Sequence, residues 1–248
     1  TTVTLDADYK TVNLMSNGAT ATTGTNLLTT LTATGATVVS IMGSSNTSLG
    51  QAFAATAAIT STSTANVTLT NAVAVGQTYT GGAGVDTFTL TTANTKATTT
   101  GAGNDVITST GLFGTGGTLD AGDGTGDTIV MTVAEAAAAT LTGVFAGKVA
   151  GLEVLSVGAT AGPATINMLN ADGISSLVET GVVGHQVDIT GALSGFTLTQ
   201  NAINTAATTI SLVNPTANTD TVNLVLAAAN GQNAGALTLN SIEILNVT

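Results

Sequence analysis

Residues 81–89 read Gly81-Gly82-Ala83-Gly84-Val85-Asp86-Thr87-Phe88-Thr89. They match, at every position, the nonapeptide Gly-Gly-x-Gly-x-Asp-x-U-x, in which U is a bulky apolar residue. The glycines permit a tight turn, and the residues after the turn can alternate between two faces as a strand does. The stretch therefore predicts one turn and one strand of a parallel coil, with Phe88 pointing into the core.

Two more copies of the nonapeptide follow. Residues 100–108 match with threonine in place of the first glycine, and residues 121–130 match with one residue inserted before the aspartate. The three aspartates are Asp86, Asp105 and Asp127, which are 19 and 22 residues apart. These separations are close to two nonapeptides, so we expect the three turns to stack along one edge of a parallel β-roll, with Ile107 and Ile129 in the core.

The three turns predict a calcium site. Glycine turns allow carbonyl oxygens to face the gap between successive turns, and each aspartate adds a carboxylate beside them; calcium takes about six to eight such oxygens. Magnesium needs stricter octahedral geometry, and transition metals favour imidazole or thiolate, which this segment lacks. The alternative is a set of Gly-Asp turns without metal. The candidate ligands are Gly81, Gly82, Gly84, Asp86, Gly101, Gly103, Asn104, Asp105, Gly122, Asp123, Gly124 and Asp127, together with Asp120, which like Asp123 lies off the consensus aspartate position.

The charge distribution points the same way. The chain carries 14 acidic residues against three lysines or arginines, a net charge of −11 with only 7% of residues charged. Half of the aspartates lie between Asp86 and Asp127, where Lys96 is the one cation. Stacked carboxylates repel each other, so calcium would contribute folding free energy. The scarcity of cations excludes nucleic acid as a partner, and the short apolar runs exclude direct membrane insertion.

Composition predicts an all-β fold of short strands, a β-solenoid or β-sandwich, with one or two short helices. Apolar residues make up 43% of the chain, aromatic residues 3%, and there are 30 glycines. A Thr-x-x-Glu capping box at Thr132 predicts a helix over 132–148, and a second is expected near 170–177. We divide the chain into a Thr/Ala-rich β region (1–75), the β-roll (76–131) and a second β-rich region (132–248). Apolar alternation predicts strands near residues 3–5, 37–41, 66–69, 196–199, 209–213 and 221–226.

A weak repeat joins two later segments. Residues 151–157 and 241–247 share an apolar-Glu-apolar-apolar-x-Val pattern. Their acids, Glu153 and Glu243, are interpreted either as solvent-facing strand residues or as cation ligands. The same question is open for Asp220 and for the pair Asp6 and Asp8, which we expect to share one face of a strand.

The sequence offers no catalytic machinery. It has no cysteine, His185 is its one histidine, and no nucleophile-elbow or zinc-hydrolase pattern is present. We therefore expect a protein that is not an enzyme. Because the chain begins at Thr1 without an initiator methionine, we expect it to be a segment of a longer protein.

The glycine-aspartate nonapeptides resemble the RTX repeats of proteins exported by type I secretion. The order of the three turns, followed by the Glu-containing strand at 151–157 and the β units from residue 208 to 247, is similar to bacterial surface-layer (S-layer) proteins of the Caulobacter type. The resemblance implies a secreted, cell-surface protein that assembles with identical subunits into a calcium-dependent two-dimensional lattice. It also implies attachment to cell-surface polysaccharide through a separate domain that this chain does not contain.

The departures from the consensus, at Thr100 and Gly126, favour two bound calcium ions over three. Two alternatives stay open. One is a module of a type I-secreted RTX adhesin, in which calcium stiffens a stalk. The other is the calcium-binding tail of a secreted RTX hydrolase, which would need a catalytic domain upstream.

Overall fold

A computed structural model describes the chain except for residues 19–23, 159–160, 182–183, 202, 215–218 and 228–234. It is nearly all-β: strands make up 49% of the described residues, and the chain winds as a parallel β-solenoid of about 9 turns. This confirms the predicted all-β solenoid, and the coil is consistent with an RTX-like β-roll. The chain divides into two compact units, one made of Thr1–Asp127 with Lys148–Gly151 and the other of Thr128–Gly147 with Leu152–Thr248.

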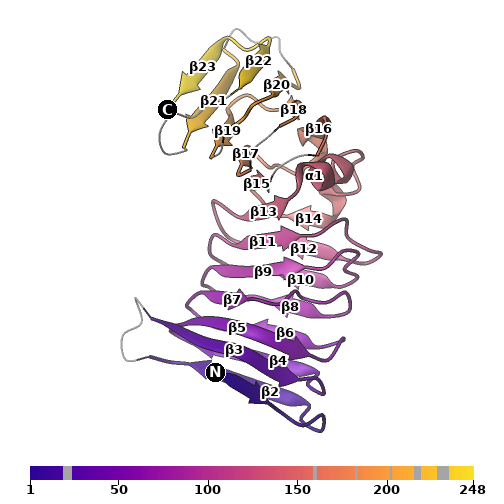
Figure 1. Cartoon of the computed structure of the whole chain (residues 1–248), viewed down its shortest axis with the longest axis vertical. Helices are drawn as coiled ribbons and strands as arrows, with labels where there is room; N and C mark the ends of the chain where they lie inside the picture. The colour runs from indigo at the N-terminus through magenta and orange to yellow at the C-terminus, as the bar shows by residue number, and fades with distance from the viewer. Residues whose placement is uncertain (19–23, 159–160, 182–183, 202, 215–218, 228–234) are drawn as a thin grey trace. The chain divides into compact units, whose positions relative to one another are not determined.

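In the first unit, successive strands alternate between two parallel sheets, so each turn of the coil adds one strand to each sheet (Figure 1). The first sheet has the order β1 (Thr2–Thr4), β3 (Thr25–Ala33), β5 (Asn46–Phe53), β7 (Val67–Leu69), β9 (Asp86–Leu90) and β11 (Val106–Ser109). The second has the order β2 (Thr11–Ser16), β4 (Val38–Gly43), β6 (Ala58–Ser61), β8 (Thr78–Thr80), β10 (Ala97–Thr99), β12 (Thr118–Asp120) and β14 (Val149–Ala150).

The core of this unit consists of side-chain columns, because residues in register on successive parallel strands lie above one another. In the first sheet Phe88 is in register with Ile107, and both are buried. Side chains two positions apart on a strand point the same way. In β9 this places Asp86 on the inward face together with Phe88 and Leu90, which the burial pattern of the strand shows. The predicted inward positions of Phe88 and Ile107 are confirmed.

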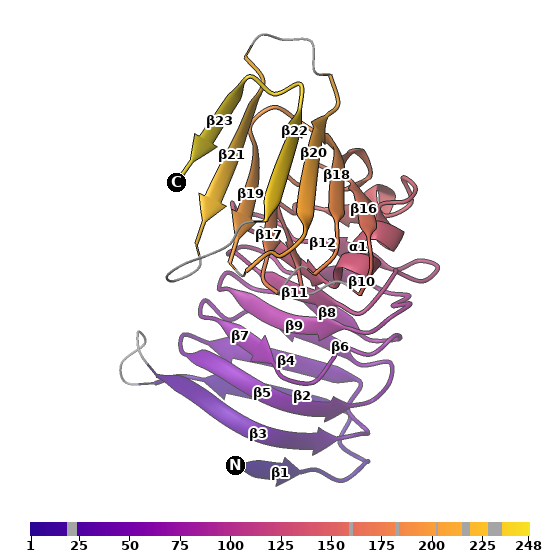
Figure 2. The ribbon, with the colours of Figure 1, turned by 45° about the horizontal axis from the view of Figure 1, so that its top comes forward.

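The second unit is built in the same way. One sheet has the order β13 (Thr128–Met131), β15 (Val154–Val157), β17 (Ser176–Glu179), β19 (Phe196–Gln200), β21 (Thr221–Leu226) and β23 (Ile244–Val247). The other has β16 (Ala164–Asn167), β18 (Val187–Ala192), β20 (Ala207–Leu212) and β22 (Ala236–Asn240), which lie side by side in Figure 2.

The helix α1 (Val133–Ala139) begins as predicted. Thr132 accepts a hydrogen bond from the Glu135 amide, and the Glu135 carboxylate accepts one from the Thr132 amide, so the capping box is formed. The helix ends at Ala139, well before residue 148. Thr140 turns its hydroxyl back to the Ala136 carbonyl, and the weak helix formers that follow it do not extend the helix. A 3₁₀ turn (η1) covers Ala146–Lys148, and Lys148 donates to the Gly114 carbonyl.

The helix predicted near 170–177 is wrong. A single 3₁₀ turn (η2) covers Met168–Asn170, and Asp172 and Gly173 then take φ angles of 49° and 78°. Two successive left-handed residues cannot continue a right-handed helix. Strand β17 begins at Ser176. Within the described ranges, no helix has the length and apolarity needed to cross a membrane.

Replacing Ile107 by alanine tests the column model. Ile107 is fully buried, so the substitution should lower the free energy of unfolding by about 2–5 kcal/mol through lost burial and the cavity left behind. Chemical denaturation followed by circular dichroism measures the loss. Its neighbour Val106 lies on the other face and is half-buried, so V106A should cost clearly less. Equal losses for the two variants would contradict the alternation.

Candidate metal centre

The three consensus aspartates form one column inside the coil of the first unit. Asp86 begins β9 and is 1% exposed; Asp105 and Asp127 are 0% exposed. The pairing of Thr87 with Val106 sets Asp86 in register with Asp105, and one turn earlier the same position is taken by Val67. A core position that holds valine in one turn therefore holds a carboxylate in the next.

Two carboxylates of the column, those of Asp105 and Asp127, bind the backbone of the turn before them. Oδ1 of Asp105 accepts the amide of Asp86 at 2.7 Å, and Oδ1 of Asp127 accepts the amide of Asp105 at 2.7 Å. These contacts satisfy buried N–H groups, as an N-cap carboxylate does at the start of a helix. The aspartates therefore link successive turns directly.

The column is incomplete at its N-terminal end. Both carboxylate oxygens of Asp86, and Oδ2 of Asp105, are buried and complete no hydrogen bond with the described part of the chain. Loss of hydration raises the pKa of Asp86 to about 7, and burial also raises the pKa of Asp105. A buried carboxylate without donors or a cation is costly, so this end of the column has the chemistry of a cation site.

The glycines make the room that the carboxylates occupy. A Cβ atom at Gly81 would overlap Oδ2 of Asp86 and the Thr100 carbonyl, and one at Gly124 would overlap Oδ2 of Asp127. Gly101 has a φ of 94°, and a Cβ there would overlap the Gly82 carbonyl. Side chains at these positions would close the space beside the acids, which accounts for the glycine spacing of the motif.

The sequence predicted that the carbonyl oxygens of the motif glycines bind the cation, but two of them accept backbone amides in the structure. The Gly82 carbonyl accepts the Ala102 amide at 2.9 Å, and the Gly101 carbonyl accepts the Asp123 amide at 2.7 Å. Both carbonyls therefore join one turn to the next. Among the described residues, no group of three or more acidic or histidine side chains converges on one point. The acids stack along the column, so the oxygens available to a cation are chiefly the carboxylate oxygens of Asp86 and Asp105.

The other polar candidates of the motif lie outside the column. Asn104, Asp120 and Asp123 are exposed. Oδ1 of Asn104 accepts the Thr125 amide, and Oδ1 of Asp120 accepts the Gly122 amide, so both stabilise the loops. The structure brings together Asp86, Asp105 and Asp127. It places Asn104, Asp120 and Asp123 outside this column.

The acids outside the motif have local roles. Glu243 accepts the Asp220 amide at 3.2 Å, which repeats the contact of Asp105 and Asp127 with the turn before them. Glu153, from the related segment, is half-buried. Asp6 and Asp8 do not share a strand face: they lie after β1, where Oδ1 of Asp6 accepts the Asp8 amide in an exposed turn.

Another buried acid, Glu179, lies in the second unit, and three side chains donate hydrogen bonds to its carboxylate. Gln200 donates to its Oε2 at 2.9 Å, Asn204 donates to the same oxygen at 3.4 Å, and Thr208 donates to Oε1 at 3.4 Å. All four residues are at most 1% exposed. Burial raises the pKa of Glu179, and the three donors oppose that rise.

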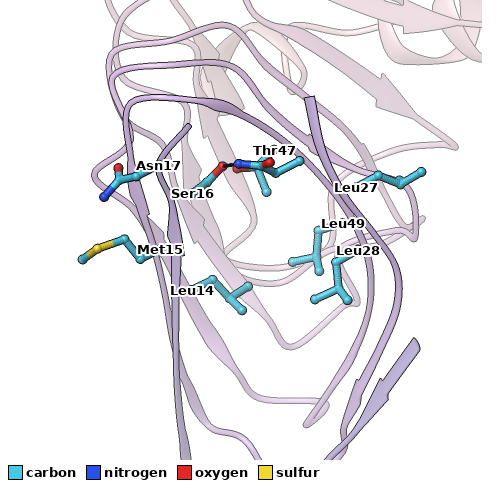
Figure 3. A pocket seen from close by; sticks show the side chains of 9 residues that line it. Leu14, Met15, Ser16, Asn17, Leu27, Leu28, Thr47 and Leu49 are labelled. Carbon is cyan, nitrogen blue, oxygen red and sulfur yellow. Dashed lines mark hydrogen bonds between the residues drawn. The ribbon is translucent and has the colours of Figure 1, made fainter. Parts of the chain in front are cut away.

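A cavity of about 400 Å³ lies among β2, β3 and β5 of the first unit. Figure 3 shows Leu14, Leu28 and Leu49 around it, together with the Ser16 hydroxyl, which accepts a hydrogen bond from Asn26. None of the residues that line it is charged. Its lining mixes leucine side chains with uncharged polar groups, and none of the column aspartates is among the lining residues.

Two buried hydroxyl groups near the column were not among the sequence-based candidates. Tyr79 of β8 and Thr98 of β10 are each 1% exposed, and they are in register with each other on the inward face of the second sheet. The signal was present in the sequence: Tyr79 lies two residues before the first motif glycine, on the face that alternation directs inward.

Comparison with known proteins does not assign the chain to a family. No protein-family model matches the chain, and no curated protein matches it.

Substitutions at Asp105 separate its role as an acceptor from its charge. With calcium removed by chelator, D105A leaves the buried Asp86 amide without its acceptor and should lower the free energy of unfolding by about 1–3 kcal/mol. D105N keeps a carbonyl oxygen in the same place and loses the buried charge, so it should cost much less. Denaturant titration measures both variants. A D105N variant as unstable as D105A would contradict the capping role.

Glu179 should make the stability of the second unit depend on pH. Its pKa is ordinary, 4.5, in the unfolded chain and raised in the fold, so its contribution is complete below pH 4.5 and is lost as the pH rises through the raised pKa. The stability difference between wild type and E179Q, measured by denaturation in chelator, should therefore fall from pH 4 towards pH 8. D172N, at an exposed acid of the same unit, should follow the wild type. A pH-independent difference for E179Q would refute this role.

Proposed function

We propose that the chain is a calcium-binding structural module of a secreted, cell-surface protein. The observation that carries this proposal is the set of buried carboxylate oxygens of Asp86 and Asp105 that complete no hydrogen bond in the described structure. Calcium suits this set because it binds carboxylate and other hard oxygen ligands with flexible geometry. When bound, it would supply the positive charge that the interior of the coil lacks.

The residues of this chain set the geometry for such an ion. The amide contacts along the column orient the carboxylates of Asp105 and Asp127, and Gly81 and Gly124 leave space beside the acids. Burial raises the pKa values of Asp86 and Asp105, which means that the ionised carboxylates are less stable in the fold than in water. Without a cation to neutralise them, the ionised aspartates would therefore oppose folding. Folding and calcium binding would therefore be coupled.

We propose further that identical copies assemble into an extracellular two-dimensional lattice. This part rests on the resemblance of the motif order to bacterial surface-layer proteins, and the calcium-dependent coil would be its structural element. A stalk module of an RTX adhesin is the alternative, because parallel coils can extend in one direction by adding turns. In either case the function is structural, and polysaccharide attachment would belong to another domain.

A calcium titration of the whole chain tests the proposal. We expect CaCl₂ added to chelator-treated protein to increase the β signal in circular dichroism and to raise the melting temperature, while MgCl₂ at the same concentration does much less. D105N should shift the calcium midpoint upwards, and D123N, at an exposed acid, should leave it near that of the wild type.

Electron microscopy of the same samples separates the assembly states. Ordered sheets that form with calcium and dissolve with chelator support the lattice, whereas calcium-dependent folding without sheets favours the adhesin module. A fold and a melting temperature that respond neither to calcium nor to chelator would refute the calcium site.

A further inference from the structure

Tyr79 occupies an unusual place in the interior of the coil. It lies between Ile59 and Thr98 in an inward column of the second sheet, with Leu119 one turn beyond Thr98. Its ring packs on Phe88, with ring centroids 4.6 Å apart and planes at 45°. A phenylalanine would fill this position as well, so packing alone does not explain the hydroxyl group.

The hydroxyl group of Tyr79 lies close enough to the carboxylate of Asp86 for each group to affect the other. The two groups affect each other: burial and the negative charge of Asp86 raise the pKa of Tyr79, and Tyr79 lowers that of Asp86 against the larger effect of burial. Nevertheless, in the described structure neither Tyr79 Oη nor either oxygen of Asp86 completes a well-formed hydrogen bond. A buried donor and a buried acceptor lie side by side without a fixed contact.

The position of the hydroxyl groups along the column gives a second argument. Thr98 follows Tyr79 in the same column, and its buried Oγ1 also completes no hydrogen bond with the described residues. Tyr79 and Thr98 belong to the turns that lead into Asp86 and Asp105. In the turn that leads into Asp127, the column position is Leu119. Buried hydroxyl groups without a completed hydrogen bond thus occur in the turns that lead into Asp86 and Asp105, the two acids that we propose as cation ligands.

We propose that Tyr79 is a positioning residue of the metal centre, and that its phenol holds the Asp86 carboxylate in the orientation that binds the cation. The inference rests on the proposed calcium binding and deepens it. An ordinary tyrosine phenol is neutral at pH 7, so its hydroxyl group can donate a hydrogen bond to the carboxylate. Partners of this kind orient metal ligands from outside the coordination shell.

The variant Y79F removes the hydroxyl group and keeps the ring contact with Phe88. We expect its calcium midpoint, followed by circular dichroism, to rise about tenfold over wild type, the order found for lost outer-shell partners. In chelator its stability should equal or exceed that of wild type, because a buried polar group without a hydrogen bond is gone. Y9F is the matched control: Tyr9 is the other tyrosine and is 57% exposed, so its midpoint should not move.

Tyrosine emission gives a readout that does not depend on Y79F folding. The chain has two tyrosines and no tryptophan, so in Y9F all tyrosine emission comes from Tyr79. We expect CaCl₂ to change this emission over the same range as the circular dichroism signal, because the carboxylate beside the phenol gains a cation.

The outcomes separate the two proposals. A wild type that responds to calcium, together with a Y79F variant of unchanged midpoint or a Y9F variant of unchanged emission, would overturn the role of Tyr79 and leave the calcium site in place. A wild type without any calcium response would overturn the calcium site and, with it, this inference.

Discussion

The first unit depends on one contact, the carboxylate of an aspartate bound to the backbone amide of the turn before it. The contact between Asp105 and Asp86 belongs to a column of charged groups that continues, one turn before Asp86, with the apolar side chain of Val67. A charged group can be buried only if the backbone leaves space and something compensates its charge. The space comes from glycines such as Gly81, and the need for compensation gives the unit its proposed dependence on a cation.

Local features of the fold were readable from the sequence. The alternation after Asp86 gave the inward positions of Phe88 and Ile107, and the capping box gave the start of α1, because both depend on residues a few positions apart. Applied one step further, the same alternation places Asp86 inward, since it lies two residues before Phe88. The prediction of a helix near 170–177 was wrong because Asp172 and Gly173 have left-handed φ angles, and the composition of the segment does not indicate such angles.

The composition of the site could not be read in the same way. The register that brings Asp86 beneath Asp105, and Tyr79 beside Thr98, joins segments about 20 residues apart, and the small offsets between turns decide which side chains meet. Both Asp105 and Asp123 were candidate ligands, the first at the consensus aspartate position and the second off it, and the coil buries the first and exposes the second. The consensus position distinguished Asp105 from Asp123, and the register showed that the consensus aspartates form a buried column.

The chain contains buried carboxylates in two kinds of surroundings, which differ in how the buried charge is compensated. Glu179 is enclosed by amide and hydroxyl donors from Gln200, Asn204 and Thr208, so its charge is compensated by the chain itself. Asp86 is buried to the same degree, but neither of its carboxylate oxygens completes a well-formed hydrogen bond, and the donors near it, Tyr79 and the amides of Gly82 and Val67, do not offset the rise in pKa that burial causes. Had selection required only a stable coil, a valine as at position 67 or an enclosed acid as at position 179 would have served. An acid whose oxygens complete no hydrogen bond agrees with the proposed ligand from outside, which would make the fold of the first unit responsive to its ionic surroundings.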